Sequence, residues 1–279
     1  MRRLARAAAC ALMVMTPPST SAAVADESTK LWRLDCGRFD VAADAFSDTF
    51  AYGEKRMELV GSCYLIKHRG RFLLWDAGLP LALIGQPLDP RQALSGTLDV
   101  SIADQLKQIG VRADQIELLA ISHNHSDHVG QAEAFSAATL LMGKADFDAL
   151  RKPDPPFGAD PGPLRPWLDG AREVTAVEGD YDIFGDQQVV MLRLPGHTAG
   201  HYGLLIRLAT GSILLSGDAV HFEAQIARRG VPPFNVDRAD TLASLERLQA
   251  IAASRNAILI VPHDSNDIHK LPRFPASRQ

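Results

Sequence analysis

The sequence predicts an α/β fold in which two sheets pack face to face and helices cover their outer surfaces. Two observations lead to this expectation. Short apolar runs typical of buried strands recur along the chain, and helical stretches lie between them in a similar order in both halves. The 279 residues are 46% hydrophobic and 22% charged, which is ordinary for a globular protein with a sizeable core in one large or two small domains.

The N-terminal half opens with three expected strands, at residues 31–36, 60–67 and 71–76. Residues 37–59 carry aromatic side chains without a clear period, and a long loop in a compact domain is more often functional than idle. A second irregular stretch, residues 78–100, precedes a helix that Ser101 caps and Gly110 ends. The apolar stripe of this helix belongs to the core.

An apolar run at residues 116–121 has the character of a buried strand and is too short for a helix. Beyond it, helices are expected at residues 131–135, 144–151 and 240–253. Further strands are expected at residues 139–142, 189–194, 202–208, 212–215 and 258–261. Residues 152–168 are rich in proline and are expected to form a surface loop.

The N-terminal segment has the three-part layout of a secretory signal peptide. Arg2, Arg3 and Arg6 precede an apolar stretch and then small residues that fit an A-x-A-like cleavage site. The apolar stretch is too short to act as a stable membrane anchor. We therefore expect removal of residues 1–25, leaving residues 26–279 as one folded domain, secreted or in the periplasm.

Removal of that segment changes the formal charge from −4 to −7, because three arginines and no acidic residue leave with it. Such a charge does not suit nucleic acid, so no nucleic-acid partner is expected. Two cysteines remain, Cys36 and Cys63. They form a disulfide in an oxidising compartment or stay as two buried thiols, and their spacing does not decide between these states. The sequence does not indicate an oligomeric state.

The most informative stretch follows the strand at 116–121 and reads His123-Asn124-His125-Ser126-Asp127-His128-Val129-Gly130. His123 and His125 are two apart on extended backbone and point to the same side of the chain. Asp127 and His128 follow a turn and face a second point nearby. Imidazole and carboxylate suit zinc and its first-row neighbours. A polar turn with histidines bonded to backbone groups is the alternative, but packing alone rarely produces this spacing.

Three later segments also place polar residues just beyond an apolar run. They are Pro195-Gly196-His197-Thr198-Ala199-Gly200-His201, Ser216-Gly217-Asp218 and Val261-Pro262-His263-Asp264. Glycine lets the backbone approach a metal closely, and α/β sheets assemble their sites beyond strand ends. One histidine at such a place is more often structural, but the segments together favour a metal site.

The order H-x-H-x-D-H, then G-H, G-D and P-H, resembles the metallo-β-lactamase superfamily over almost the whole chain after residue 25. The resemblance implies that family's αβ/βα four-layer sandwich and a dinuclear site for two zinc ions or other first-row divalent metals. It implies that His123, His125 and His197 hold one metal, that Asp127, His128 and His263 hold the other, and that Asp218 bridges them. Such metals lie ~3.5–4 Å apart in two-metal hydrolases. Asp76 matches a family position that supports the metal loop, and a capped turn explains it equally well.

Within the superfamily, the chain is similar to the N-acyl-homoserine lactonases. Flavodiiron reductases usually carry Glu where His125 stands, and zinc β-lactamases carry Cys or Ser where Asp218 stands. Only 16 residues follow His263, too few for the glutathione-binding domain of glyoxalase II. RNase Z-like nucleases need a basic surface. Residues 33–37, 62–66 and 74–78 resemble the opening strands of the lactonases.

The resemblance implies a secreted hydrolase that opens a lactone or related ester, with N-acyl-homoserine lactones as expected small-molecule substrates and quorum quenching as the expected role. A water shared by the metals, with its pKa lowered to about 7, would supply the attacking hydroxide. Asp127 is expected to act as ligand and proton carrier. His221 stands where those lactonases carry a tyrosine that contacts the substrate carbonyl, and a histidine can also donate a hydrogen bond there.

The expected substrate-binding residues, most of them on the aromatic stretch, are Phe46, Phe50, Tyr52, Met57 and His221. The alternative is that the aromatic side chains only pin this stretch to the sheet. Two other functions remain open: another hydrolase of the same fold, such as a β-lactamase or thioesterase, and a metal-binding protein without turnover. The complete ligand set argues against the latter.

Overall fold

A computed structural model of the chain describes residues 28–279 and contains two β-sheets. The expected signal peptide, residues 1–25, lies outside the described residues. In the described part, no helix is long and apolar enough to cross a membrane.

The first sheet has seven strands in the order β4-β1-β2-β3-β5-β6-β7. Their bounds are Lys30–Ala42 (β1), Arg56–His68 (β2), Arg71–Trp75 (β3), Leu94–Thr97 (β4), Ile116–Ile121 (β5), Thr139–Gly143 (β6) and Val174–Val177 (β7). Strands β1 to β4 pair antiparallel, whereas β3, β5, β6 and β7 pair parallel.

The second sheet has five strands in the order β12-β11-β10-β9-β8. Their bounds are Tyr181–Asp182 (β8), Val189–Arg193 (β9), Tyr202–Leu208 (β10), Gly211–Leu215 (β11) and Ile258–Ile260 (β12). Strand β10 is antiparallel to both β9 and β11, and β12 is parallel to β11. The carboxyl ends of β9, β11 and β12 therefore lie at the same edge of the sheet.

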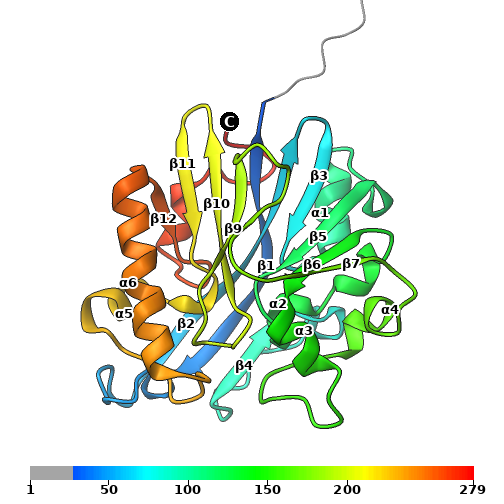
Figure 1. Ribbon diagram of the computed structural model, residues 1–279. Coiled ribbons are helices and arrows are strands. Elements are labelled where there is room, and N and C mark those ends of the chain that lie inside the picture. The colour runs from blue at the N-terminus through cyan, green and yellow to red at the C-terminus, as the bar shows by residue number, and fades with distance from the viewer. Residues whose placement is uncertain (1–27) are drawn as a thin grey trace, which may run out of the picture.

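Helices cover the outer face of each sheet (Figure 1). They are α1 (Ile102–Gln108), α2 (Ser126–Val129), α3 (Lys144–Leu150), α4 (Arg165–Leu168), α5 (Glu223–Arg228) and α6 (Arg238–Arg255). The first four lie beside the seven-stranded sheet, and α5 and α6 lie beside the five-stranded sheet. This is the expected four-layer αβ/βα sandwich.

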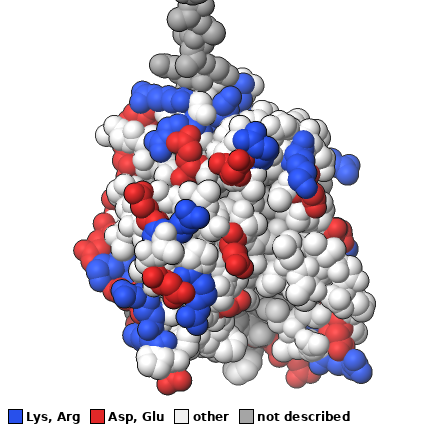
Figure 2. All heavy atoms as spheres, turned by 90° about the vertical axis from the view of Figure 1, so that its right-hand side faces the viewer, with Lys and Arg blue, Asp and Glu red and all other residues white. Residues whose placement is uncertain are grey.

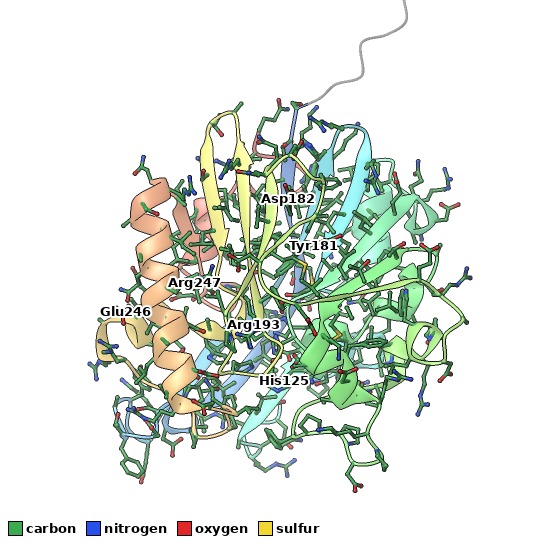
Figure 3. All side chains as sticks on the ribbon, viewed as in Figure 1. His125, Tyr181, Asp182, Arg193, Glu246 and Arg247 are labelled. Atoms are coloured by element: carbon green, nitrogen blue, oxygen red, sulfur yellow. A yellow bond between two sulfur atoms is a disulfide. The ribbon has the colours of Figure 1, made fainter. Side chains whose placement is uncertain are left out.

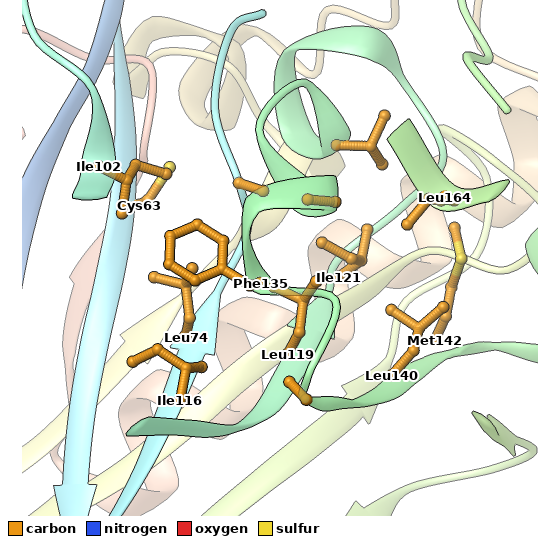
Figure 4. Close-up of a cluster of buried hydrophobic side chains, with 14 of the residues drawn as sticks. Cys63, Leu74, Ile102, Ile116, Leu119, Ile121, Phe135, Leu140, Met142 and Leu164 are labelled. Atoms are coloured by element: carbon orange, nitrogen blue, oxygen red, sulfur yellow. The ribbon is translucent and has the colours of Figure 1, made fainter. Parts of the chain in front are cut away.

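Three apolar cores separate the four layers. One core lies between the sheets and joins side chains such as Tyr64 and Trp75 to Leu204 and Ile213. A second packs α1 and the following helices onto the first sheet, as the close-up in Figure 4 shows around Phe135. A third seats α6 on the second sheet. Burial on both sides of each sheet explains why the strands have near-continuous apolar sequences.

The expectation of an irregular stretch at residues 37–59 is wrong at both ends, which are strand, and right between them. Strand β1 continues to Ala42 and β2 begins at Arg56, with a short 3-10 turn at Ala43–Phe46. Phe39 and Val41 are buried and alternate with more exposed neighbours, which is the strand period. Cys36 sits at a β-bulge that shifts the register between Asp35 and Gly37, and the bulge breaks the alternation.

The structure also contains helices and strands that the sequence did not predict. Strand β4 lies within the stretch 78–100, helix α4 lies within the proline-rich stretch, and strands β7 and β8 were not expected. The segment expected as a helix at 131–135 is a 3-10 turn at Ala132–Phe135. Helix α1 forms as expected, because the Ser101 side chain accepts a hydrogen bond from the backbone N–H of Asp104.

Cys36 and Cys63 form a disulfide between β1 and β2. It lies beneath the turn after β3, where the backbone N–H of Leu79 donates to the Cys36 carbonyl (3.2 Å). A Cβ on Gly78 would lie 2.8 Å from Cys36 Cβ, so only glycine fits against the disulfide at this point. The sequence left the pairing open, and the structure shows it.

Candidate metal centre

Four segments bring the predicted ligands together at one edge of the two sheets. They follow β5, β9, β11 and β12, and the labelled His125 marks the place in Figure 3. Strand β5 belongs to the first sheet and the other three strands belong to the second. The site is therefore built by both halves of the molecule.

The first group of side chains consists of His123, His125 and His197. His197 Nε2 lies 3.1 Å from His123 Nε2 and 3.0 Å from His125 Nδ1. The potential ligand atoms of the group all lie within 4.8 Å of one another. Three ring nitrogens that converge on one point can offer lone pairs to a single cation.

The second group consists of Asp127, His128 and His263. His263 Nε2 lies 3.3 Å from His128 Nε2 and 3.7 Å from Asp127 Oδ2. Asp127 is the most exposed of the three, because its side chain retains 22% of its accessible surface. This group also gathers within 4.8 Å.

Asp218 lies between the two groups. Its Oδ2 is 3.8 Å from His123 Nε2 and 3.6 Å from His197 Nε2, while its Oδ1 is 3.4 Å from His128 Nε2 and 3.2 Å from His263 Nε2. Oδ1 is buried without a hydrogen-bond partner among the described residues. A buried acceptor that lacks a donor is costly, and a cation on each side would satisfy the carboxylate. The residues present therefore fit a pair of metal ions.

Burial and neighbouring charges favour the metal-binding forms of His123, His197 and Asp218. Desolvation by burial lowers the pKa of His123 and of His197 well below the usual range, so both rings are neutral at neutral pH. Burial alone would raise the pKa of Asp218, but His263, His128 and other neighbouring rings hold it well below its usual range. Neutral imidazole and ionised carboxylate are the forms that bind a metal.

Outer hydrogen bonds fix the orientation of the ligand rings. His128 Nδ1 donates to Asp76 Oδ2 (3.0 Å), and Asp76 Oδ1 accepts from the backbone N–H of Ser122 (2.7 Å). Asp76 thus both caps the turn and supports a ligand ring. His263 Nδ1 donates to the Val60 carbonyl (2.7 Å), which ties the ligand loop to β2. In both rings Nε2 is left to face the site.

Asp146 supports the ligand loops, and the sequence analysis did not identify it. A single acidic residue at the start of an expected helix gives no signal of such a role. Its carboxylate accepts from Thr198 Oγ1 (2.6 Å), the Gly200 N–H (2.7 Å) and the Asn124 N–H (3.2 Å). Asn124 lies between two predicted ligands, and Thr198 follows a third. The carboxylate of Asp146 therefore joins two ligand-bearing loops.

His201 belongs to one of the predicted motifs but is not oriented as a ligand. Its Nδ1 donates to the Leu194 carbonyl (2.8 Å), and its Nε2 accepts from the backbone N–H of Asp218 (2.8 Å). Both ring nitrogens are used. His201 therefore orients the backbone that carries Asp218.

A cavity of about 370 Å³ opens beside the ligands and is mainly apolar. Besides predicted ligands and His221, it is lined by Phe39, Val41, Ala45, Phe46, Leu59, Leu79, Ala93, Leu94, Ser126, Phe157, Gly158 and Phe234. A volume of this order suits a small molecule. Several of these residues gave no sequence signal, because they come from different strands and loops.

Of the aromatic residues expected to bind substrate, only Phe46 lines the cavity. Phe50 is 84% exposed and lies between the 3-10 turn at Ala43–Phe46 and strand β2. Tyr52 packs against Phe222 with ring centroids 4.9 Å apart, and Met57 lies on β2 outside the lining. The structure does not place these three at the cavity, because only the strand ends of this stretch and the first turn after β1 line it, whereas no residue from 47 to 57 does.

Basic and acidic side chains are interspersed on the face of the molecule in Figure 2. No basic patch gathers on that face.

The chain matches the family model described as the metallo-beta-lactamase superfamily over residues 56–263. Curated relatives include the N-acyl homoserine lactonase AttM of Rhizobium radiobacter, 27% identical, with 76% of this chain and 86% of that protein covered. An N-acyl homoserine lactonase from Bacillus sp. is 25% identical, with 88% and 97% covered.

Solved structures show the same fold. An N-acyl homoserine lactone hydrolase with N-hexanoyl-L-homoserine at its catalytic metal center matches with a TM-score of 0.75 at 23% identity, covering 90% of this chain and 99% of that chain. AidC, a dizinc quorum-quenching lactonase in complex with a product, matches with a TM-score of 0.63 at 16% identity, covering 89% of each chain.

Proposed function

Because the chain belongs to the metallo-β-lactamase superfamily of hydrolases, we propose that it opens the lactone ring of N-acyl homoserine lactones and so acts in quorum quenching. The observation that carries the proposal is the double ligand cluster joined by Asp218 at the floor of an apolar cavity. The curated lactonases that it resembles over most of its length support the choice of substrate.

We propose that His123, His125 and His197 bind one zinc ion, that Asp127, His128 and His263 bind a second, and that Asp218 bridges them. Zinc suits a set of imidazole and carboxylate ligands without cysteine. When bound, such ions make a water acidic near neutral pH and polarise an ester carbonyl. The side chain of Asp127 is more open to solvent than those of His128 and His263, which suits the proton transfer to the departing alkoxide that the proposal assigns to it.

The cavity explains how the chain would select its substrate. A homoserine lactone ring offers little apolar area, so binding free energy must come from the acyl chain. Phe46, Phe39 and Leu59 line the wall beside the ligands. Each methylene buried there adds about 0.8 kcal/mol. We therefore infer that the acyl chain lies along this wall while the ester carbonyl faces the ligands.

An assay of the purified, zinc-loaded protein tests this function. N-acyl homoserine lactones of increasing chain length, a thioester and a β-lactam are compared, with the metal content measured alongside. We expect about two metals per chain and a kcat/KM for lactones that rises over the first several acyl carbons. Brisk cleavage of the thioester or β-lactam without lactone cleavage would assign a different hydrolase activity, and no turnover at full metal content would indicate a binding protein.

We also propose that the protein is exported. The arginine-rich start and the small residues near position 25 support this proposal. N-terminal sequencing of protein purified from its native host should find a first residue between Val24 and Lys30. An intact Met1 on that protein would contradict export by this route.

A further inference from the structure

We propose that His221 is a further metal ligand, which joins His197 and Asp218 on one ion. The inference rests on the two-metal site of the proposed function but not on the identity of the substrate. His221 Nε2 lies 3.3 Å from Asp218 Oδ2, and the potential ligand atoms of His221, Asp218 and His197 all lie within 4.8 Å of one another. His221 is 4% exposed and lines the cavity at its metal end.

Two backbone groups fix the orientation of the Gln225 side-chain amide. Its Nε2 donates to the Phe46 carbonyl (3.0 Å), and its Oε1 accepts from the backbone N–H of His221 (2.6 Å). A carbonyl can only accept and an N–H can only donate, so the two contacts agree on one orientation of the amide. Gln225 Oε1 is therefore an acceptor at a known position.

This acceptor determines the tautomer of His221. Gln225 Oε1 lies 3.3 Å from His221 Nδ1, so the contact is favourable only when Nδ1 carries a proton. In the neutral ring, Nε2 then presents a lone pair. Nε2 faces the Asp218 carboxylate at 3.3 Å, and the contact is favourable when a positive charge, a proton or a metal ion, lies between the two atoms.

A metal ion bound to both the ring and the carboxylate would supply this charge, and the geometry of neighbouring rings favours it. The arrangement matches that of two ligand rings of the proposed metal pair, His128 and His263, whose Nδ1 atoms donate to an outer acceptor and whose Nε2 atoms face Asp218. The ring of His221 is also held in place by its neighbours. Its centroid lies 5.0 Å from that of Phe46 and 5.9 Å from that of Phe234, both in edge contacts.

The alternative role is that of a donor to the substrate carbonyl, which requires a proton on Nε2 in the metal-loaded protein. The two roles therefore differ in one atom. A ligand has its Nε2 bonded to the metal, and a donor has its Nε2 bonded to hydrogen. The difference can be measured without any substrate.

The test is nuclear magnetic resonance of the full folded chain, with isotope-labelled histidine nitrogen and a spin-active cadmium isotope in place of zinc. We expect scalar coupling between cadmium and Nε2 of His221, and its disappearance in His221→Phe. A one-bond coupling of Nε2 to hydrogen in the fully loaded protein, without coupling to cadmium, would overturn the inference. The wild-type spectrum alone decides, whether or not the variant folds.

Gln225→Leu tests the positioning by Gln225. Loss of the acceptor should weaken binding of one of the two metals by roughly 10–100-fold, as for other outer partners of ligand rings, and weaken the coupling to His221. His269→Ala, which removes an exposed histidine outside the site, is the matched control and should change neither quantity. If His221 couples to cadmium and the zinc form cleaves no lactone, only the proposed function fails. If lactones are cleaved while Nε2 carries hydrogen, only this inference fails.

Discussion

Asp146 shows how one buried carboxylate can hold a metal site in shape without touching a metal. Burial raises its pKa to about 6, although Thr198, Gly200 and Asn124 all donate to it. The three donors offset only part of the cost of burying the charge. The residue thus favours the site geometry at some expense of stability near neutral pH.

This loss of folding stability can be measured as a pH dependence. Between the ordinary aspartate pKa of 3.8 and the folded pKa of about 6, the folded state binds the proton of Asp146 more tightly than the unfolded state does. The contribution of this group to stability is therefore present at low pH and is lost as the pH rises through the folded pKa. Relative to Asp146→Asn, the wild type should lose up to about 3 kcal/mol between pH 4 and pH 7. Urea unfolding of metal-free protein measures it, and a wild type that gained stability over this range relative to the variant would contradict it. Asp148→Asn, on the exposed side of α3, is the control.

Phe46 and Phe50 form a natural pair for testing the cavity wall. They lie close in sequence, but Phe46 is 3% exposed and lines the cavity, whereas Phe50 is 84% exposed. Phe46→Ala should lower kcat/KM for long-chain lactones by about tenfold or more, because apolar surface beside the acyl chain is lost. The effect should shrink for short chains. Phe50→Ala should leave kcat/KM unchanged for long-chain and short-chain lactones alike. Equal effects of the two substitutions would remove Phe46 from the substrate site.

At the scale of elements, the proline-rich loop contacts the metal site through one glycine, Gly158. Gly158 has φ +81°, and a Cβ there would lie 2.7 Å from the His125 ring. Its carbonyl also accepts from the N–H of Ser126 (3.0 Å), at the start of α2. The loop that was expected to be only a surface feature therefore sets the position of a ligand.

Gly158→Ala should lower metal occupancy, because both the backbone and the ring of His125 must move. Gly170→Ala is a matched control, since Gly170 also has a positive φ (+77°) but its Cβ would meet nothing within 4 Å. The two variants carry the same backbone penalty, of order 1 kcal/mol. The metal content of both variants, measured by atomic spectroscopy, separates the effect of backbone strain from that of displacing the His125 ring. Similar occupancy in both variants would show that the contact with His125 has no effect.

The elements also show what the sequence could and could not predict. The strand at 116–121 and the helix after Ser101 were predictable, because each has a strong period and a clear boundary. The continuation of β1 past Cys36 was not, since the bulge reverses which residues face the core. Strand β8 has only two residues, Tyr181 and Asp182, which is too short for any period.

The candidate site divides in the same way. The predicted ligands lie in local motifs, and the structure brings them together because four strand ends meet at one edge. Asp146, Gln225 and Phe234 lie outside those motifs and carry no motif of their own. These residues act through tertiary contacts. Such contacts leave no local pattern in the sequence from which they could be predicted.

At the scale of the molecule, the site joins the two sheets. The segment after β5 supplies ligands from the first sheet, and those after β9, β11 and β12 supply ligands from the second. An ion bound only by the folded state stabilises it, by about 2.7 kcal/mol when free metal is 100 times the Kd. For a chain of this size we expect removal of that metal to lower Tm by roughly 5–10 °C. Calorimetry with a chelator, against the chelator already saturated with zinc, measures it. Coincident transitions would contradict a metal that bridges the halves.

The disulfide described above has a consequence for anyone who handles the protein. The Cys36 carbonyl and side chain support the turn at Gly78, whose own carbonyl accepts from the N–H of Gly130 just after α2. Material produced in a reducing cytosol, or stored with a strong reductant, would lack the covalent link under the helix that carries Asp127 and His128. Dithiols bind divalent metals as well as reducing disulfides, so one additive would disturb the centre in two ways at once. A phosphine reductant and a separate chelator, applied in turn, would attribute any loss of activity to the bond or to the ions.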